Sequence, residues 1–177
     1  MGNLAALIMR LVLGGLMAGH GAQKLFGSFR GPGLEGTSGF MEMLGLQPGR
    51  PWAYLAGLAE FGGGALTLLG FLNPLGPLGV IGSRAMSATT AHKGKPIWVT
   101  EGGAELPLTN MAAATALILN GPGKWSVDRA LGLSLPRWLA PLGLVAVILT
   151  VMYANTETEE PPEQDEAREG AAGNDEV

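Results

Sequence analysis

Five long apolar stretches, separated by short polar linkers, dominate the hydropathy pattern of this chain. They cover residues 4–26, 52–72, 75–92, 106–120 and 138–154. Each approaches the length that a helix needs to cross a bilayer, about 17–25 residues. One such stretch also fits a buried core helix, but five of them leave almost no polar face for water. The pattern therefore predicts an all-α, polytopic membrane helix bundle.

The bundle is predicted to have two parts and a tail. A four-helix domain covers residues 1–137, and an additional C-terminal transmembrane helix covers residues 138–154. At about 17 residues this fifth helix has the minimum length for a span. Residues 155–177 are predicted to form a disordered acidic tail, because they are rich in Glu and Asp and nearly free of large apolar residues.

The linkers place the polar surfaces. If the first four stretches span, the long loops 27–51 and 93–105 emerge on one face, and residues 121–137 emerge on the other. Within the first loop, Ser38 is predicted to cap a short amphipathic helix that lies at the membrane interface. Lysine and arginine are divided too evenly between the two faces to fix the orientation.

Composition narrows the possible chemistry. Glycine accounts for 29 of the 177 residues, which predicts close helix packing through small residues. The absence of cysteine excludes disulfides, thiol catalysis, Cys-ligated zinc and thiolate-held iron–sulfur clusters. The sequence shows no metal-ligand motif and no basic aromatic patch for nucleic acid. The sequence therefore predicts that the main partner of this protein is the lipid bilayer.

Ionisable and polar side chains of the predicted spans gather in the half that faces the two long loops. They are His20, Lys24, Glu60, Arg84, Glu105 and Asn110. Glu60 stands eight residues into the second span and Arg84 eight residues before the end of the third, so both lie about 12 Å deep. We predict that they form a buried ion pair. Loss of Arg84 alone should then harm folding more than loss of both residues.

Arg10 and the two histidines allow more than one interpretation. Arg10 lies toward the opposite surface, where it either snorkels to water or faces the inside of the bundle. His20 and His92 both fall near the long-loop face. A bis-histidine haem site would need both imidazoles on one macrocycle. Two interfacial histidines bonded to their neighbours need no cofactor, and this interpretation is favoured.

Taken together in order and spacing, several segments resemble the DoxX family of small bacterial membrane proteins. "RLVLGGLMAGHGAQKLFG" resembles its first span and includes His20 and Lys24, and "LAGLAEFGGGALTLLGFLNPLG" resembles its second span with Glu60. "GGAELPL" and "GPGKWSVD" resemble later elements and contain Glu105 and Asp128. The resemblance runs from about residue 10 to residue 132, while the fifth apolar stretch and the acidic tail exceed the usual four-helix unit.

The resemblance implies a multi-pass protein of the bacterial inner membrane that acts as a quinone-linked oxidoreductase, or as a subunit of one with a soluble or membrane redox partner. Lys24 and Arg84 would then hold an anionic substrate or semiquinone. His20 or His92 would move protons, and Glu60 would set the charge of Arg84 or relay protons. The candidate catalytic residues are therefore His20, Lys24, Glu60, Arg84 and His92. The candidate cofactor-binding residues are Lys24, Arg84, Glu105 and Asn110.

Two other functions stay open at this stage. The chain carries no evident cofactor motif, so a non-enzymatic membrane scaffold that organises a soluble redox partner also fits. A small-solute transporter is a third and weaker alternative, because buried charges also mark ion pathways. Quinone is the one cofactor suggested, and it comes from the resemblance. Whether the protein is catalytic, and whether it forms a homo-oligomer, the sequence leaves open.

Overall fold

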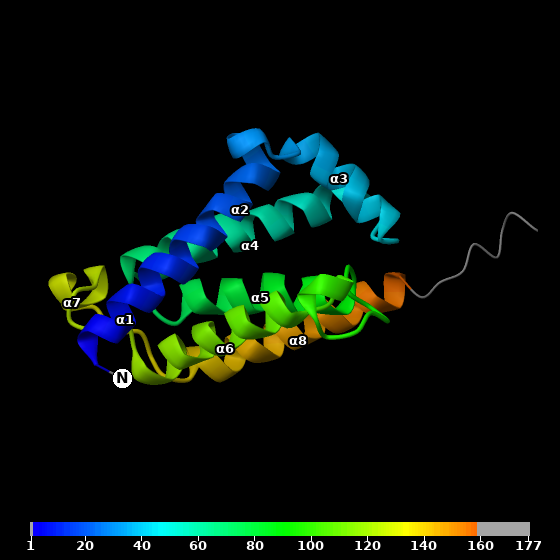
Figure 1. Ribbon diagram of the computed structural model, residues 1–177. Helices are drawn as coiled ribbons and strands as arrows, with labels where there is room; N and C mark the ends of the chain where they lie inside the picture. Colours follow the sequence, from blue (N-terminus) through cyan, green and yellow to red (C-terminus); the bar gives the residue numbers. More distant parts are fainter. Residues whose placement is uncertain (1, 159–177) are drawn as a thin grey trace, which may run out of the picture.

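The computed structural model describes residues 2–158, and every regular element in this part of the chain is a helix (Figure 1). The elements are α1 (Asn3–Met9), the π-helical turn η1 (Arg10–Gly14), α2 (Gly15–Phe26), η2 (Ser28–Arg30), α3 (Gly33–Met43), α4 (Gly49–Leu69), α5 (Leu75–Thr89), η3 (Val99–Glu101), α6 (Glu105–Asn120), α7 (Val127–Leu131) and α8 (Leu139–Glu157). The predicted all-α class is confirmed for the described residues. The long helices coincide closely with the five apolar stretches.

Glycines end two of the long helices. α1, η1 and α2 form one continuous helix over Asn3–Phe26, and it stops at Gly27 with a left-handed φ of 69°. α4 stops in the same way at Gly70, with a φ of 62°. Glycine adopts this conformation without a Cβ clash, so it is the usual residue just after a helix. Both stops turn the chain directly into the next helix or short helical turn.

The helices pack around α5. α2 crosses α4 along much of its length, α4 packs on α5, and α5 also contacts α6 and α8. Figure 1 shows α5, α6 and α8 running side by side, with α2 and α4 on the other side of α5 and α3 lying across one end. One core cluster consists of Leu13, Met17, Val80, Ile81, Ala114 and Leu117. Segments distant in the sequence therefore meet at the middle of the bundle.

Two helices in the described part of the chain are long and apolar enough to cross a membrane, by length and composition. They are Asn3–Phe26 and Leu139–Thr156, the second within α8. α5 and α6 have 15 and 16 residues, which at about 1.5 Å per residue is shorter than a hydrocarbon core of about 30 Å. The number of spans therefore stays a prediction.

The long helices carry apolar side chains on their outer surface as well as on the faces that pack against other helices. On α8 the exposed side chains include Leu142, Ile148, Leu149 and Met152. On the first helix they include Leu4, Ile8, Leu11 and Leu16. Contiguous apolar surface of this extent is unusual for a protein surrounded by water. Lipid is the solvent that such a surface matches, so the helices have the character of membrane helices.

Two local expectations concern the segments at the ends of helices. α3 begins at Gly33, so Ser38 lies inside this helix and the predicted cap at that residue is wrong. One face of the helix packs on the bundle, since Thr37 and Met41 are buried, while the apolar side chains of Phe40 and Met43 are exposed. The predicted acidic tail lies outside the described residues except for its first part, where α8 continues to Glu157.

Glycines let the backbones of α2 and α4 touch. A Cβ on Gly64 would overlap the backbone of Ala18 and lie 2.8 Å from the carbonyl carbon of Met17. A Cβ on Gly21 would overlap the backbone of Phe61 in the same interface. Small residues are the means by which helices approach closely in a membrane. The prediction that glycines allow close helix packing is therefore confirmed for α2 and α4.

We expect Gly64→Ala to destabilise the protein by about 1–3 kcal/mol, because the added methyl group forces α2 and α4 apart. Gly62→Ala is the matched control on the same helix, since a Cβ there meets nothing within 4 Å. Thermal unfolding followed by circular dichroism in one detergent compares the two variants. Equal stability of both would contradict the close contact between α2 and α4.

Candidate functional site

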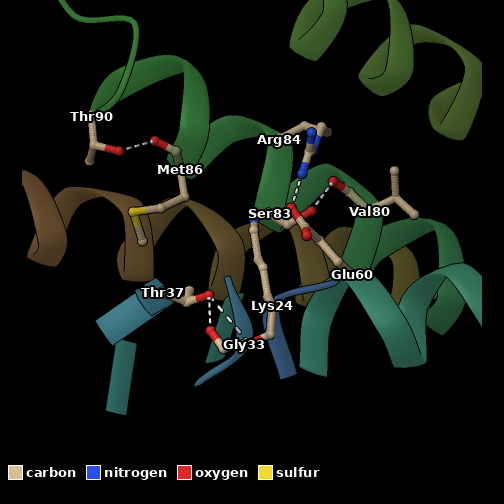
Figure 2. Close-up of polar contacts among 9 residues, drawn as sticks. All are labelled: Lys24, Gly33, Thr37, Glu60, Val80, Ser83, Arg84, Met86 and Thr90. Atoms are coloured by element: carbon tan, nitrogen blue, oxygen red, sulfur yellow. Dashed lines mark hydrogen bonds and ion pairs between the residues drawn. The ribbon is translucent and has the colours of Figure 1, made fainter. Parts of the chain in front are cut away.

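Three charged side chains from three helices converge between α2, α4 and α5. The Oε1 atom of Glu60 on α4 accepts from the Nζ atom of Lys24 at 2.6 Å and also contacts Nη2 of Arg84 on α5. Figure 2 shows both cations directed at the one carboxylate. The predicted Glu60–Arg84 ion pair is therefore present. We call Lys24, Glu60 and Arg84 the charge cluster.

The position of Glu60 follows from the buried face of α4. Ala53, Gly57, Glu60, Gly64 and Thr67 are all buried and recur at intervals of three or four residues. This spacing places them on one face of a helix. Because the other members are small or short, α2 and α5 come close to Glu60. The glutamate side chain is 1% exposed as a result.

Lys24 is the member of the charge cluster whose contact with Glu60 was not predicted from the depths of the residues in the membrane. It lies near the end of α2, yet its side chain reaches Glu60 and is 27% exposed. The contact depends on how closely α2 crosses α4, which glycine positions such as Gly21 and Gly64 determine. No spacing along one helix predicts that crossing. The position of Lys24 in the last turn was the signal available in the sequence.

The charge cluster is not electrically balanced. It holds two cations and one carboxylate, and its members lie inside the helix bundle. Among the described residues, Oε2 of Glu60 and Nε of Arg84 are buried without a hydrogen-bond partner. A buried polar group without a partner costs free energy. The cluster therefore contains one unpaired acceptor, one unpaired donor and one more cation than anions.

Lys24 also lines an apolar cavity of about 340 Å³ between α3, α4, α5 and α8. It is the only charged residue among the described residues that line this cavity. The walls include Trp52 and Leu55 from α4, Leu78 and Met86 from α5, and Val147 from α8. The volume falls within the range of small-molecule sites, about 300–1,000 Å³. We call this space the Lys24 cavity.

The two histidines occupy different places. His20 is exposed on α2, within electrostatic reach of Lys24 and Arg84, and it interacts with Gln23. His92 follows α5 and its Nδ1 atom lies 2.6 Å from the carbonyl oxygen of Gly102. It lines a separate open pocket with Lys93 and Lys95. The structure thus brings His20 to the flank of the charge cluster and places His92 in the loop that follows.

The two remaining candidates lie on α6. Oε2 of Glu105 accepts from the backbone N–H of Val99 at 2.9 Å, so this carboxylate holds the loop before α6. Asn110 is half-buried one to two turns further along the helix. Neither residue lines the Lys24 cavity. Of the predicted cofactor-binding residues, the structure brings Lys24 and Arg84 together and leaves these two apart.

A second polar cluster lies at the opposite end of the bundle. Arg10 is 4% exposed and donates to the carbonyl oxygens of Leu68, Pro122 and Trp125. The snorkelling interpretation of Arg10 is therefore wrong, and the interpretation that it faces inward is confirmed. Asp128, also buried, accepts from the backbone N–H groups of Leu72 and Asn73. This cluster joins η1, the end of α4 and the α7 region through backbone groups that a sequence does not reveal.

The family model of DoxX matches residues 5–93, which is half of the chain. The chain belongs to the DoxX family. All three members of the charge cluster lie within the matched residues, whereas α6, α7 and α8 follow them. Family and apolar helices together make this DoxX protein a membrane protein. Searches of curated proteins and of solved structures gave no match.

Proposed function

We propose that this DoxX protein is a multi-pass protein of the bacterial inner membrane that binds a lipid-soluble quinone beside Lys24. It would act as a quinone-linked oxidoreductase or as the quinone-binding subunit of one. The observation that carries the proposal is the place of Lys24, whose ammonium group lies at an otherwise apolar cavity and contacts a buried carboxylate. Buried ionisable residues in membrane helices are candidates for function.

The residues at the cavity fit a quinone. A quinone carries carbonyl oxygens on an apolar ring, so it needs hydrogen-bond donors at one place and apolar walls elsewhere. An ammonium group has three donors, and Glu60 accepts from one of them. The remaining two can be directed at a carbonyl oxygen. The cavity supplies the apolar walls, and its volume suits a ring with part of a tail.

The chain's own groups would each have one task. When bound, the quinone supplies an acceptor for two electrons and two protons, and a redox partner of this protein would supply the electrons. Lys24 donates to the carbonyl oxygen, and Glu60 holds the lysine in position. Arg84 adds positive charge that favours electron-rich ligands. His20, exposed beside the cluster, can deliver protons.

Quinone binding gives a direct test. We expect Lys24→Gln to weaken binding of a decyl-substituted benzoquinone at least tenfold, since a hydrogen bond to a charged group contributes about 1.5–3 kcal/mol. Lys124→Gln is the matched control, because Lys124 is exposed at the opposite end of the bundle. Binding is measured by equilibrium titration of the purified protein in phospholipid nanodiscs.

The outcomes separate the candidate functions. Tight binding by the unchanged chain and by Lys124→Gln, with loss in Lys24→Gln, supports the proposal. Absence of binding by the unchanged chain would overturn it and leave the scaffold for a redox partner as the better account. Equal binding by both variants would show that Lys24 does not hold the quinone.

A further inference from the structure

α8 lies outside the residues that match the DoxX family, yet it forms one wall of the Lys24 cavity. It packs mainly along α5. Gly143 and Gly82 make this approach possible: a Cβ on Gly82 would lie 3.3 Å from Val147, and a Cβ on Gly143 would overlap the side chain of Leu78. The residues that α8 contributes to the wall are Gly143, Ala146, Val147, Thr150 and Val151.

The C-terminal part of α8 packs against residues of α3 and α4. The ring of Tyr153 stacks on Trp52 of α4, with centroids 6.0 Å apart. Ala154 is fully buried against Met41, Leu46 and Ala53. These contacts fix α8 against the corner of α3 and α4. Trp52, Met41 and Leu46, which these contacts involve, also line the cavity, and residues of both α4 and α8 form its walls.

Three of the hydroxyl groups along the walls already donate hydrogen bonds within the protein. Ser83 donates to the carbonyl oxygen of Val80, Thr90 to that of Met86, and Thr150 to that of Ala146, each within its own helix. Figure 2 shows the first two bonds. Because these hydroxyl groups already donate hydrogen bonds within the protein, this part of the cavity favours an apolar ligand. Lys24 is the one charged group that the described residues contribute to these walls.

Both helices that border the cavity also present apolar side chains to the outside. Leu55 and Leu58 of α4 are 46% and 57% exposed, and Leu144 and Ile148 of α8 are 44% and 49% exposed. In a bilayer these side chains contact lipid. A hydrophobic ligand dissolved in the bilayer can therefore reach the cavity between α4 and α8 without passing through water.

We infer that α8 forms the binding wall for the hydrocarbon tail of the quinone, which enters between α4 and α8 with its ring toward Lys24. The ligand class is thus a quinone with a long hydrocarbon tail, and Ala146 of α8 is a specificity-determining residue. This inference rests on the proposed function. It adds that the affinity for the quinone depends on its hydrocarbon tail, and that α8, which lies beyond the residues matched by the family model, binds this tail.

The experiment compares two benzoquinones that differ only in a methyl or a decyl substituent. Trp52 lines the cavity and serves as the reporter, because a bound quinone quenches its fluorescence. Trp98, Trp125 and Trp138 are 59–61% exposed and are replaced with phenylalanine. A chain that retains Trp138 in place of Trp52 measures quenching by quinone dissolved in the lipid. All titrations use nanodiscs with excess phospholipid.

Ala146→Phe fills the cavity from the α8 side. Val145→Phe is the matched control, because Val145 is the neighbouring residue, is 52% exposed and does not line the cavity. We expect Ala146→Phe to weaken binding of the decyl compound at least tenfold and that of the methyl compound less than twofold. Val145→Phe should leave both dissociation constants within twofold of the unchanged chain.

The inference and the proposed function fail in different ways. If the unchanged chain binds both compounds but Ala146→Phe changes neither, or changes both equally, α8 does not hold the tail and the inference is wrong. If the unchanged chain shows no preference for the decyl compound in this excess of phospholipid, the cavity is an ordinary lipid site and the inference is also wrong. If the unchanged chain binds neither compound, the proposed function itself is wrong.

Discussion

Replacing Glu60 with glutamine is expected to destabilise the protein more than any other single change in the charge cluster, by about 3–5 kcal/mol. Its carboxylate is the shared partner of Lys24 and Arg84. Without it, two cations remain close together with no countercharge from the cluster. Removing one partner of a buried ion pair leaves an uncompensated charge, which is the costly state.

The two cations are expected to be less sensitive. Arg84→Met leaves Glu60 paired with Lys24, and Lys24→Met leaves it paired with Arg84. The structure thus revises the sequence-based expectation for Arg84, which assumed that Glu60 would lose its only partner. The triple variant with Lys24→Met, Glu60→Leu and Arg84→Met removes every charge and should recover most of the stability that Glu60→Gln loses.

Unfolding of each variant in the same detergent, followed by circular dichroism, gives the order of stabilities. Glu35→Gln is the matched control, because Glu35 is exposed on α3 and the change is the same. We expect the triple variant to unfold at a higher temperature than Glu60→Gln. A Glu60→Gln protein as stable as Glu35→Gln would mean that water or a counterion reaches Lys24 and Arg84.

Depth counting along helices predicted the Glu60–Arg84 pair of the charge cluster and could not predict the Lys24–Glu60 pair. α4 and α5 are antiparallel and joined by a short link, so equal numbers of residues from that link place Glu60 and Arg84 side by side. Lys24 comes from a helix joined to α4 through the long loop 27–51, and its contact depends on the crossing of α2 and α4. That crossing is a property of packed glycines rather than of hydropathy.

The Lys24 cavity was beyond the sequence for a related reason. α8 is apolar on all sides, so its sequence does not show which face contacts α5 and which face borders the cavity. Hydropathy predicted that the helix exists and where it begins. Its neighbours follow from the contacts of Gly143 with Leu78 and of Tyr153 with Trp52. Such long-range pairings leave no periodic signal in a single chain.

Arg10 carries the other large effect, and we expect Arg10→Met to destabilise the protein by about 3–5 kcal/mol. The guanidinium group donates to Pro122 at 2.7 Å, to Trp125 at 2.9 Å and to Leu68 at 3.1 Å. All three acceptors are backbone carbonyls, so the substitution leaves buried acceptors unsatisfied. It also removes the positive charge within electrostatic reach of Asp128.

Lysine at this position is expected to restore little of that stability, because a guanidinium group is a planar fork with five donors whereas an ammonium group is a single point. One ammonium group cannot meet the Leu68 carbonyl on α4 and the two carbonyls of the 121–126 segment together. Arg50→Lys is the control, since Arg50 is exposed at the start of α4. Hydrogen exchange of residues 121–128 should rise in Arg10→Lys before the rest of the bundle opens. If Arg10→Lys matches Arg50→Lys in stability and in exchange, the charge of Arg10 suffices and the forked geometry does not fasten this end of the bundle.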